Sequence, residues 1–331
     1  MDNGYERILK EGWGLSLERG IRTRTGLICH TDGGVFELRK PRGNAESIRF
    51  GADVKERLRQ NGFRNVSRFR RTLEGEPFFA EDGTLFVLEG LLPKESLSEE
   101  TERDFLTGAE LLGKMAEASG GLESTHGKWD RNRLPARYAG RRGELAKIRH
   151  RIDRRGGYDA IDLMVLSRYE EYTERIKEAE ALLLEAEYSH LSEEAEKRGS
   201  FCHRAFKGEN IRTDSVGRAF VAGFDRAEGE IALCDLGSYL RRYMKKTGGS
   251  AEGVRCMLDA YEKHSHISDR ELLLLRALAV YPEKFLRLLN EYYNRRRVCV
   301  SPAMSERMAG AVREEEQGRR LAEFLRQLSR K

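Results

Sequence analysis

The chain has 331 residues, of which 39% are hydrophobic and 35% are charged. That length allows one large or two modest domains with buried cores, and the apolar content excludes an intrinsically disordered chain. The net charge of +5 is a small difference between 60 basic and 55 acidic side chains, so it does not by itself indicate a nucleic-acid-binding protein.

The sequence carries no pattern of a membrane span or an export signal. No segment approaches the roughly 18 uninterrupted apolar residues of a span, and Met1 to Lys10 has no apolar run after its charges. We therefore expect synthesis in the cytoplasm, no signal peptide and no membrane partner. The cysteines are widely spaced without a Cys-x-x-Cys pair, which predicts buried thiols rather than zinc ligands or disulfides. They are Cys29, Cys202, Cys234, Cys256 and Cys299.

Residues 15 to 90 have the pattern of an antiparallel sheet with one helix. A glycine turn at Asp32-Gly33-Gly34 predicts a hairpin between the segments on either side. Ala45 to Gln60 predicts a helix that stops at Asn61-Gly62. The predicted strands are 27–29, 35–38, 66–72, 78–79 and 85–88.

Beyond Pro93 the composition shifts towards long helices, which predicts a domain boundary at Glu89 to Pro93. The first helix is expected at Glu99 to Ala118, and a terminal helix is expected within Ser305 to Lys331. A further helix carries apolar residues in alternating steps of four and three, a seam that other helices must cover. Its apolar positions are Val165, Tyr169, Tyr172, Ile176, Ala179, Leu183 and Ala186.

The segment Arg131 to Arg155 holds ten basic residues against Glu144 and Asp153. Such a segment attracts anionic partners at low ionic strength, but arginine-rich stretches between helices are usually solvated faces. Tyr138 is the only aromatic residue interleaved with the charges, which argues against nucleic acid as a partner.

The residues that carry chemistry lie between 200 and 237. His203 and Asn210 stand seven apart in the frame His-x-Asp-x-x-x-x-Asn, and Asp225 follows after a short hairpin, as in enzymes that transfer phosphate from ATP. In that frame the asparagine and the later aspartate hold magnesium, and the aspartate two residues after the histidine accepts the hydroxyl proton. The position of that proton acceptor is occupied by Ala205, which has none.

These motifs, in this order and spacing, resemble the spore-coat protein S (CotS) family, relatives of aminoglycoside phosphotransferases and choline kinases. The resemblance covers nearly the whole chain. The matching segments are Asp32 to Leu38, Leu58 to Phe63, Cys202-His203 to Asn210, Asp225, Asp235-Leu236, and Tyr281 to Phe285 ahead of Tyr292-Tyr293.

The resemblance implies an α+β, bilobal, protein-kinase-like fold. Residues 1–90 would form a small antiparallel-sheet N-lobe with one helix, and residues 91–331 a large, mainly helical C-lobe containing a degenerate catalytic loop at 203–210. It further implies residence in the coat of the forming spore, with spore-coat proteins as partners and Mg-ATP as the cofactor.

The family's functional residues carry over one by one. Asn210 and Asp225 would be magnesium ligands, although a loop asparagine or aspartate often only caps a turn. His203 would brace the catalytic loop, and Asp235 would tie that loop to the following helix.

The resemblance places the family's nucleotide-binding lysine at Arg39, with Lys40 as the alternative in a shifted register. Successive strand residues point to opposite faces, so both side chains cannot face the phosphates. An arginine would still pair with phosphate, through its planar fork. The helix partner of this cation would be Glu46 or Glu56, and the phosphate loop would be Arg22 to Gly26, whose one glycine supplies backbone freedom.

Two functional hypotheses follow. The absent base at Ala205 favours a pseudokinase that binds or assembles, and the alternative is an active ATP-dependent phosphotransferase of the aminoglycoside or choline kinase type with Glu209 or Asp214 as a non-standard base. In the assembly role, Arg131 to Arg155 and the tail Ser305 to Lys331 are candidate docking surfaces for acidic coat partners.

Overall fold

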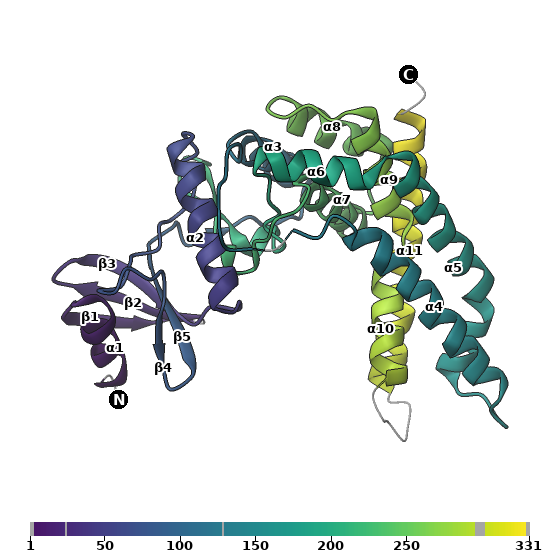
Figure 1. Ribbon diagram of the computed structural model, residues 1–331, viewed down its shortest axis with the longest axis horizontal. Helices are drawn as coiled ribbons and strands as arrows, with labels where there is room; N and C mark the ends of the chain where they lie inside the picture. Colours follow the sequence, from purple (N-terminus) through teal and green to yellow (C-terminus); the bar gives the residue numbers. More distant parts are fainter. Residues whose placement is uncertain (1–2, 24, 128, 295–301, 329–331) are drawn as a thin grey trace. The chain divides into compact units, whose positions relative to one another are not determined.

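The computed structural model describes residues 3–23, 25–127, 129–294 and 302–328. They fall into two compact units (Figure 1). Unit 1 comprises Met1–Trp129, Glu194–Asp235 and Ala260–Ser265, and unit 2 comprises Asp130–Glu193, Leu236–Asp259 and His266–Lys331. The predicted boundary at Glu89 to Pro93 falls inside unit 1, so the division into lobes at that point stays a prediction.

Unit 1 begins with a five-stranded sheet in the order β1-β2-β3-β5-β4. All neighbouring strands are antiparallel. The strands are β1 (Leu17–Arg22), β2 (Gly26–Thr31), β3 (Gly34–Arg39), β4 (Phe79–Glu81) and β5 (Thr84–Gly90). The predicted hairpin of β2 with β3 is therefore confirmed, and β4 with β5 forms a second hairpin.

Helices cover both faces of this sheet (Figure 1). Helix α1 (Asn3–Trp13), which sequence reasoning missed, packs on one face and α2 (Ala45–Gln60) on the other. Strand β5 contributes to the core on both faces, because its alternate side chains point to opposite faces of the sheet. Phe86 and Leu88 join the core under α1, whereas Val87 joins the core under α2.

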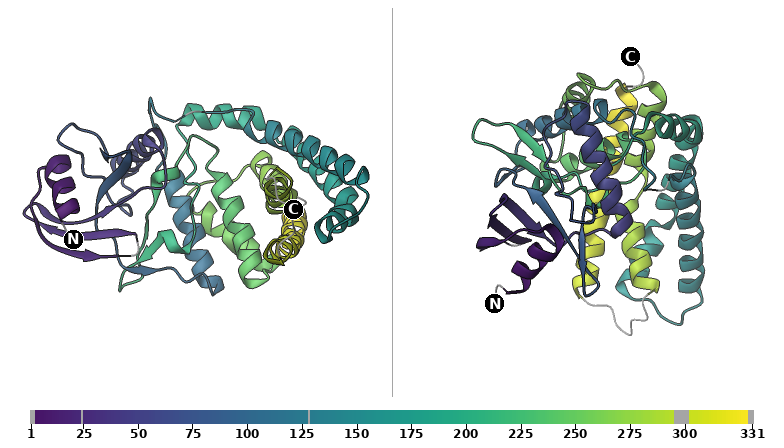
Figure 2. Two further views of the ribbon diagram at one scale, coloured as in Figure 1. Left: turned by 90° about the horizontal axis from the view of Figure 1, so that it is seen from below. Right: turned by 60° about the vertical axis from the view of Figure 1, so that its left-hand side comes forward.

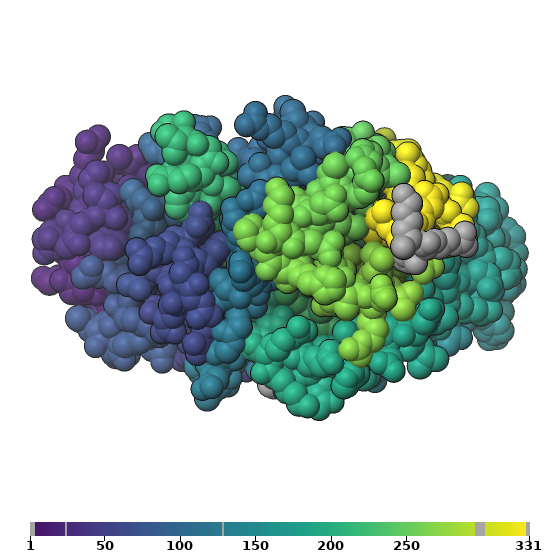
Figure 3. Space-filling model, turned by 90° about the horizontal axis from the view of Figure 1, so that it is seen from above, coloured from purple at the N-terminus to yellow at the C-terminus, as the bar shows by residue number. Residues whose placement is uncertain are grey.

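Local sequence signals set the ends of α2. The side chain of Asn44 accepts a hydrogen bond from the backbone N–H of Ser47, which caps the first turn. After Asn61 the chain turns at Gly62, whose φ of +87° favours glycine. The predicted bounds of this helix are confirmed. Its outer face, dark blue in Figure 3, is exposed to solvent.

The strand predicted at 66–72 is wrong. This segment forms only isolated bridges, Val66 to Val221 and Phe69 to Glu89. Next to the second bridge the Arg70 N–H donates to the Leu88 carbonyl at 2.7 Å, whereas the Arg70 carbonyl accepts the indole N–H of Trp13 at 2.8 Å in place of a strand partner.

The remainder of unit 1 positions the candidate catalytic loop. A small antiparallel sheet has the order β6-β7-β8. Helix α3 begins after a capping box formed by Thr101 and Asp104, later than the predicted start at Glu99, whose φ of +55° lies outside helical space. The elements are β6 (Glu95–Ser96), α3 (Glu102–Glu117), η1 (Gly208–Asn210), β7 (Ile211–Thr213), β8 (Ala219–Val221) and η2 (Phe224–Arg226).

Helices form the rest of the described chain. The apolar seam predicted for α5 is buried except for the half-buried Tyr169. Helix α5 packs against α4 and α9, and Figure 2 shows α4 and α5 side by side. Arg131 to Arg155 is mostly helix α4, which corrects the expectation of a segment between helices. The helices are α4 (Arg133–Asp153), α5 (Ala160–Glu185), α6 (Tyr188–Arg198), α7 (Leu233–Thr247), α8 (Ala251–Glu262), α9 (Asp269–Val280), α10 (Glu283–Asn294) and α11 (Pro302–Leu328).

The described cysteines are free thiols. Cys29, Cys202 and Cys234 are buried as predicted, Cys256 on α8 is only half-buried, and Cys299 lies outside the described residues. Burial raises the pKa of Cys29 to about 11. Across the described ranges, no helix has the length and apolar character needed to cross a bilayer.

Candidate functional site

Two adjoining cavities in unit 1 lie beside the predicted catalytic loop. The first, which we call the cationic cavity, has a volume of about 360 Å³, and its wall includes Lys40, Ala205 and Asp225. The second, which we call the linker cavity, has a volume of about 470 Å³ and is lined along one side by Gly90 to Lys94. Six residues line both cavities: Thr25, Glu37, Arg39, Arg212, Ala222 and Gly223.

Asp235 holds the start of the loop. Its buried carboxylate accepts hydrogen bonds from the backbone N–H groups of His203 and Arg204. Arg204 adopts a φ of +61°, a conformation that non-glycine residues rarely hold without such support. The loop and the first turn of α7 are therefore tied together by the residue predicted for this role.

His203 is a buried brace. Its Nδ1 accepts a hydrogen bond from the Ala205 backbone N–H at 3.2 Å, so Nε2 carries the proton and donates to the Ala222 carbonyl at 3.0 Å. Burial lowers the pKa of His203 to about 4, which keeps the imidazole neutral. The side chain does not line either cavity, so its bonds set the loop backbone rather than contact a ligand.

Asn210 lies at the cationic cavity with its amide fixed. The Asn210 Nδ2 donates to the Ala205 carbonyl at 2.7 Å, which leaves the amide oxygen as the atom for a further partner. Gly223, at φ +82°, lies against this side chain, because a Cβ there would stand 3.3 Å from the Asn210 amide.

The position predicted for the proton acceptor holds a methyl group at the cavity wall. Ala205 lines the cationic cavity. Of the two predicted substitutes, Glu209 lines the same cavity but pairs with Lys207 at 2.7 Å. Asp214 does not line it, because its carboxylate accepts hydrogen bonds from Arg218 and closes the β7–β8 turn.

Both oxygens of the Asp225 carboxylate accept hydrogen bonds from protein donors. Arg39 binds both oxygens through its guanidinium fork, at 2.6 and 2.7 Å, and the backbone N–H of Arg42 adds a bond at 3.1 Å. Asp225 is only 4% exposed. These three hydrogen bonds use most of the lone pairs of the carboxylate, and the magnesium role of Asn210 and Asp225 stays a prediction.

Arg39 is also bonded to Glu89 on β5, a partner that the sequence analysis missed. The Glu89 carboxylate in turn binds the ammonium of Lys55 on α2 and the hydroxyl of Ser67 at 2.6 Å. Lys55 is 1% exposed. An unbroken series of charge pairs therefore runs from Lys55 through Glu89 and Arg39 to Asp225.

This series corrects the predicted helix partner of Arg39. Glu46 and Glu56 are exposed, and Glu56 pairs with Arg68 at 3.7 Å. The sequence does mark Lys55 and Glu89, because each charged residue stands at a position where the pattern of its helix or strand calls for a buried apolar residue. Lys55 lies seven residues after the buried Ile48 on the same helical face, and Glu89 alternates with the buried Val87.

The pKa values of Glu89 and Lys55 depend on both their burial and their charged partners. Burial by itself would raise the pKa of Glu89, but Arg39 and Lys55 together lower it to about 2. For Lys55 burial dominates, and its pKa is lowered although Glu89 opposes the change.

Gly26 does not have the role expected of it in the predicted phosphate loop. Gly26 is the first residue of β2 and pairs with Arg39. A Cβ at Gly26 would stand 2.1 Å from the Leu38 carbonyl oxygen, so glycine serves the close approach of two strands rather than movement over phosphates. Arg24, within the same predicted loop, lies outside the described residues.

Basic side chains dominate the cationic cavity. Seven basic and three acidic residues line it, an excess of four positive charges. Within the described part of the chain, the side chains of Lys40, Arg42 and Arg226 have no hydrogen bond or ion pair to an acidic group. The same described part contains no group of three or more His, Cys, Asp or Glu residues arranged to hold a metal ion.

Lys40 and Arg39 separate as the strand geometry predicts. The Arg39 guanidinium points to Asp225, whereas the Lys40 ammonium lies 5.4 Å from the centroid of the Phe86 ring on the other face of the sheet. Lys40 follows the end of β3 and still reaches the wall of the cationic cavity.

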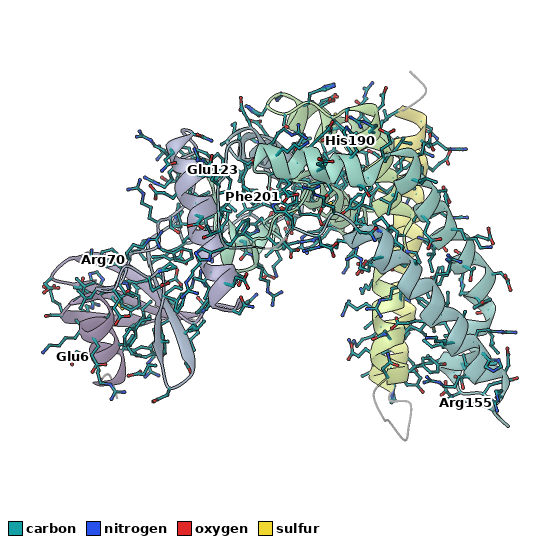
Figure 4. The ribbon with its side chains drawn as sticks, viewed as in Figure 1. Glu6, Arg70, Glu123, Arg155, His190 and Phe201 are labelled. Atoms are coloured by element: carbon teal, nitrogen blue, oxygen red, sulfur yellow. The ribbon has the colours of Figure 1, made fainter. Side chains whose placement is uncertain are left out.

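The basic helix α4 in unit 2 has intramolecular partners for much of its charge. Arg155, labelled in Figure 4 just beyond the end of α4, donates to the buried Asp162 at 2.8 Å. This pairing reduces the charge that the helix can offer to an acidic partner. The other pairs are Arg131 with Glu193, Arg137 with Glu283, Arg141 with Glu144, Arg142 with Glu180, and Arg149 with Asp153.

Close backbone approach fixes Asp225 relative to α2, which gives a stability prediction. A Cβ at Gly51 would stand 2.4 Å from the Phe224 carbonyl oxygen. We expect Gly51→Ala to lower the free energy of unfolding by about 1–3 kcal/mol in urea titrations. Gly140 on α4, where a Cβ meets nothing within 4 Å, is the control, and its change to alanine should raise stability by about 0.5–1 kcal/mol. Equal stability of Gly51→Ala and the unmodified chain would contradict the contact.

Solved structures with the same fold are phosphotransferases and kinases. An aminoglycoside phosphotransferase from Alicyclobacillus acidocaldarius has a TM-score of 0.82 at 15% identity, covering 96% of this chain and 94% of that chain. A spectinomycin phosphotransferase in complex with ADP and spectinomycin has a TM-score of 0.56 at 10% identity, covering 96% and 98%. A choline/ethanolamine kinase family protein from Mesorhizobium loti has a TM-score of 0.54 at 14% identity, covering 98% and 99%.

At these identities the likeness concerns the fold alone, and it confirms the expected α+β, kinase-like architecture. The comparison with curated proteins found no match. A family model described as "Spore coat putative kinase YutH" matches residues 6–327. This match confirms the resemblance to kinase-like spore-coat proteins.

Proposed function

The chain belongs to the YutH family of spore-coat kinase-like proteins, and from that premise we propose that it is a pseudokinase of the coat that binds ligands and partners without transferring phosphate. The observation that carries the proposal is Ala205, a methyl group at the cavity wall where a phosphoryl-transfer loop places its proton acceptor. A positioned base contributes typically ~10² to 10⁴ in rate, so its loss removes a large part of catalysis.

The surroundings of Ala205 offer no clear replacement. Glu209 is held by Lys207, and Asp214 is committed to its turn. The loop nevertheless keeps its folded form, because Asp235 and Asn210 hold the backbone on either side of Ala205. A loop that is preserved in shape but lacks its acceptor supports a role in binding rather than in chemistry.

The ligand class follows from the relatives. The structural neighbours include proteins described in complex with ADP or with AMP-PNP and calcium, and we extend nucleotide binding from them to this chain as part of the proposal. The coat location and the coat-protein partners are likewise extended from the family description.

The second candidate is an active ATP-dependent phosphotransferase acting on a small alcohol. It is favoured by the intact Asn210 to Ala205 bond and by Glu209 at the wall of the same cavity. If Glu209 left Lys207 and reached a bound hydroxyl, it could accept the proton.

The two candidates differ in turnover. We expect the purified chain to consume no ATP above background in the presence of magnesium and choline, ethanolamine or aminoglycosides. The measurement is ADP release with each acceptor, and Glu209→Gln and Asn210→Ala are the matched variants. Robust turnover that both variants abolish would refute the pseudokinase and establish the phosphotransferase.

A further inference from the structure

We propose that the cationic cavity binds the phosphate groups of a nucleotide directly on basic side chains, without a divalent cation. This inference rests on the proposed function, because it concerns the ligand of the same cleft. We propose binding without magnesium because Arg39 and the Arg42 backbone N–H already bind the Asp225 carboxylate.

The first step is the state of that carboxylate. Magnesium binds nucleotides through oxygen ligands that must offer free lone pairs. In this chain Arg39 takes both oxygens of Asp225 with its guanidinium fork, and the Arg42 backbone N–H takes a further lone pair. A divalent cation at this point would stand beside a buried guanidinium of the same sign, which is unfavourable in a site of low dielectric constant.

Arg39 cannot simply swing away. Its side chain is 13% exposed and its guanidinium is also bonded to Glu89, so Arg39 is held from two sides. Moving it out would leave two buried carboxylates, those of Glu89 and Asp225, with one fewer cation between them, an outcome that costs several kcal/mol in buried pairs.

The second step is the charge of the cavity wall. Magnesium normally neutralises the phosphates of a nucleotide, and here the protein supplies that charge itself. Lys40, Arg42 and Arg226 line the cavity without an acidic partner in the described chain. Uncompensated cations that converge on one concave surface attract an anion with several charges, such as a polyphosphate.

The third step separates a nucleotide from other anions. The linker cavity adjoins the cationic cavity and shares six lining residues with it, so one ligand can occupy both. Its walls include Ile21, Ile28 and Leu92, together with the linker after β5. Apolar side chains beside an extended backbone suit a flat heterocycle, which tripolyphosphate and an acidic peptide both lack.

The test uses the full chain and compares ATP with inorganic tripolyphosphate, each in EDTA and in excess magnesium, by thermal shift and calorimetry. We expect ATP to bind and stabilise the fold in EDTA at least as well as in magnesium, with tripolyphosphate binding more weakly because it lacks the base. Binding of ATP only when magnesium is present would overturn the proposal, as would no ATP binding in either buffer.

Asp225→Asn distinguishes the two roles of this residue. As the counter-ion of Arg39, Asp225 is not needed for the ligand, so the variant should bind ATP in EDTA with unchanged or higher affinity. If Asp225 were instead a magnesium ligand, the unmodified chain would bind ATP in the magnesium buffer and the variant would lose that binding. Circular dichroism of the variant confirms that the fold is retained, and the double variant Asp225→Asn with Arg39→Gln removes both members of the pair if the single variant is unstable.

The basic side chains are tested directly by Arg42→Gln with Arg226→Gln. Loss of these two cations should weaken ATP binding in EDTA at least about tenfold. Arg64→Gln with Arg103→Gln, two exposed arginines outside both cavities, is the charge-matched control and should leave affinity unchanged. Binding of a polyglutamate peptide together with no binding of ATP would overturn the proposal in favour of an acidic protein partner. ATP turnover would instead refute the pseudokinase, so the two failures are distinguishable.

Discussion

Replacing Glu89 by glutamine is expected to lower the free energy of unfolding by about 3–5 kcal/mol, because it removes the one anion between two buried cations. Lys55 is 1% exposed, and Glu89 is its acidic partner in the described chain. Arg39 would keep Asp225 but lose its second carboxylate. Urea titration followed by circular dichroism measures the change.

Two further variants make this expectation specific. Lys55→Met added to Glu89→Gln should recover part of the loss, since it removes the buried ammonium that the single change leaves without its partner. Glu81→Gln on β4 is the matched control, because Glu81 pairs with an Arg7 side chain that is 59% exposed, and its loss should cost less than about 1 kcal/mol. Equal effects at Glu89 and Glu81 would contradict the buried series.

The same carboxylate predicts a pH dependence. The pKa of Glu89 is about 2 in the folded chain against 4.5 ordinarily, so the folded state binds its proton less readily than the unfolded state. Its contribution, roughly 3 kcal/mol, is therefore fully present above pH 4.5 and is lost as the pH falls towards 2. Stability measured across this window should fall more steeply for the unmodified chain than for Glu89→Gln.

Replacing Glu315 by glutamine is expected to destabilise unit 2 by a similar amount, about 3–5 kcal/mol. Glu315 on α11 is fully buried and binds the Arg241 guanidinium at 2.6 Å. Its other oxygen accepts the backbone N–H groups of Lys284 and Phe285 at the start of α10. A glutamine would direct an N–H₂ group at a guanidinium or at a helix N-terminus, and both of these are donors.

The adjacent Glu316 supplies the control for this change. Its side chain is 37% exposed and contacts Arg168 and Arg319 at 3.7 and 3.5 Å. Glu316→Gln should change the free energy of unfolding by less than about 1 kcal/mol in the same titration. If Glu315→Gln were equally mild, the ion cluster would not hold α11 to its neighbours.

The sequence was sufficient to predict those elements whose ends are set by residues adjacent in the chain. Helix α2 was predicted at its full length because Asn44 and Gly62 act on adjacent backbone. The strand predicted at 66–72 was wrong, and there Trp13, more than fifty residues away, takes a carbonyl that a ladder would have used. The start of α3 was misplaced by three residues because the capping box lies at Thr101.

Part of the candidate site could likewise be predicted from the sequence, and part could not. The order of His203, Ala205, Asn210 and Asp225 along the chain was enough to identify the loop and its absent base. The ion pairs from Lys55 through Glu89 to Arg39 could not be predicted from the sequence. They join a helix to two strands, and no local pattern indicates which buried charges will pair.

By itself, then, the sequence determined the kinase-like order of elements, the family and the methyl group at the position of the base, because each depends on residue identity and spacing along one chain. Only the tertiary structure decided that Arg39 pairs with both oxygens of the Asp225 carboxylate and that Arg42 and Arg226 line one cavity. Ion pairing in a protein depends on distance and burial, and both are fixed by packing between segments far apart in sequence.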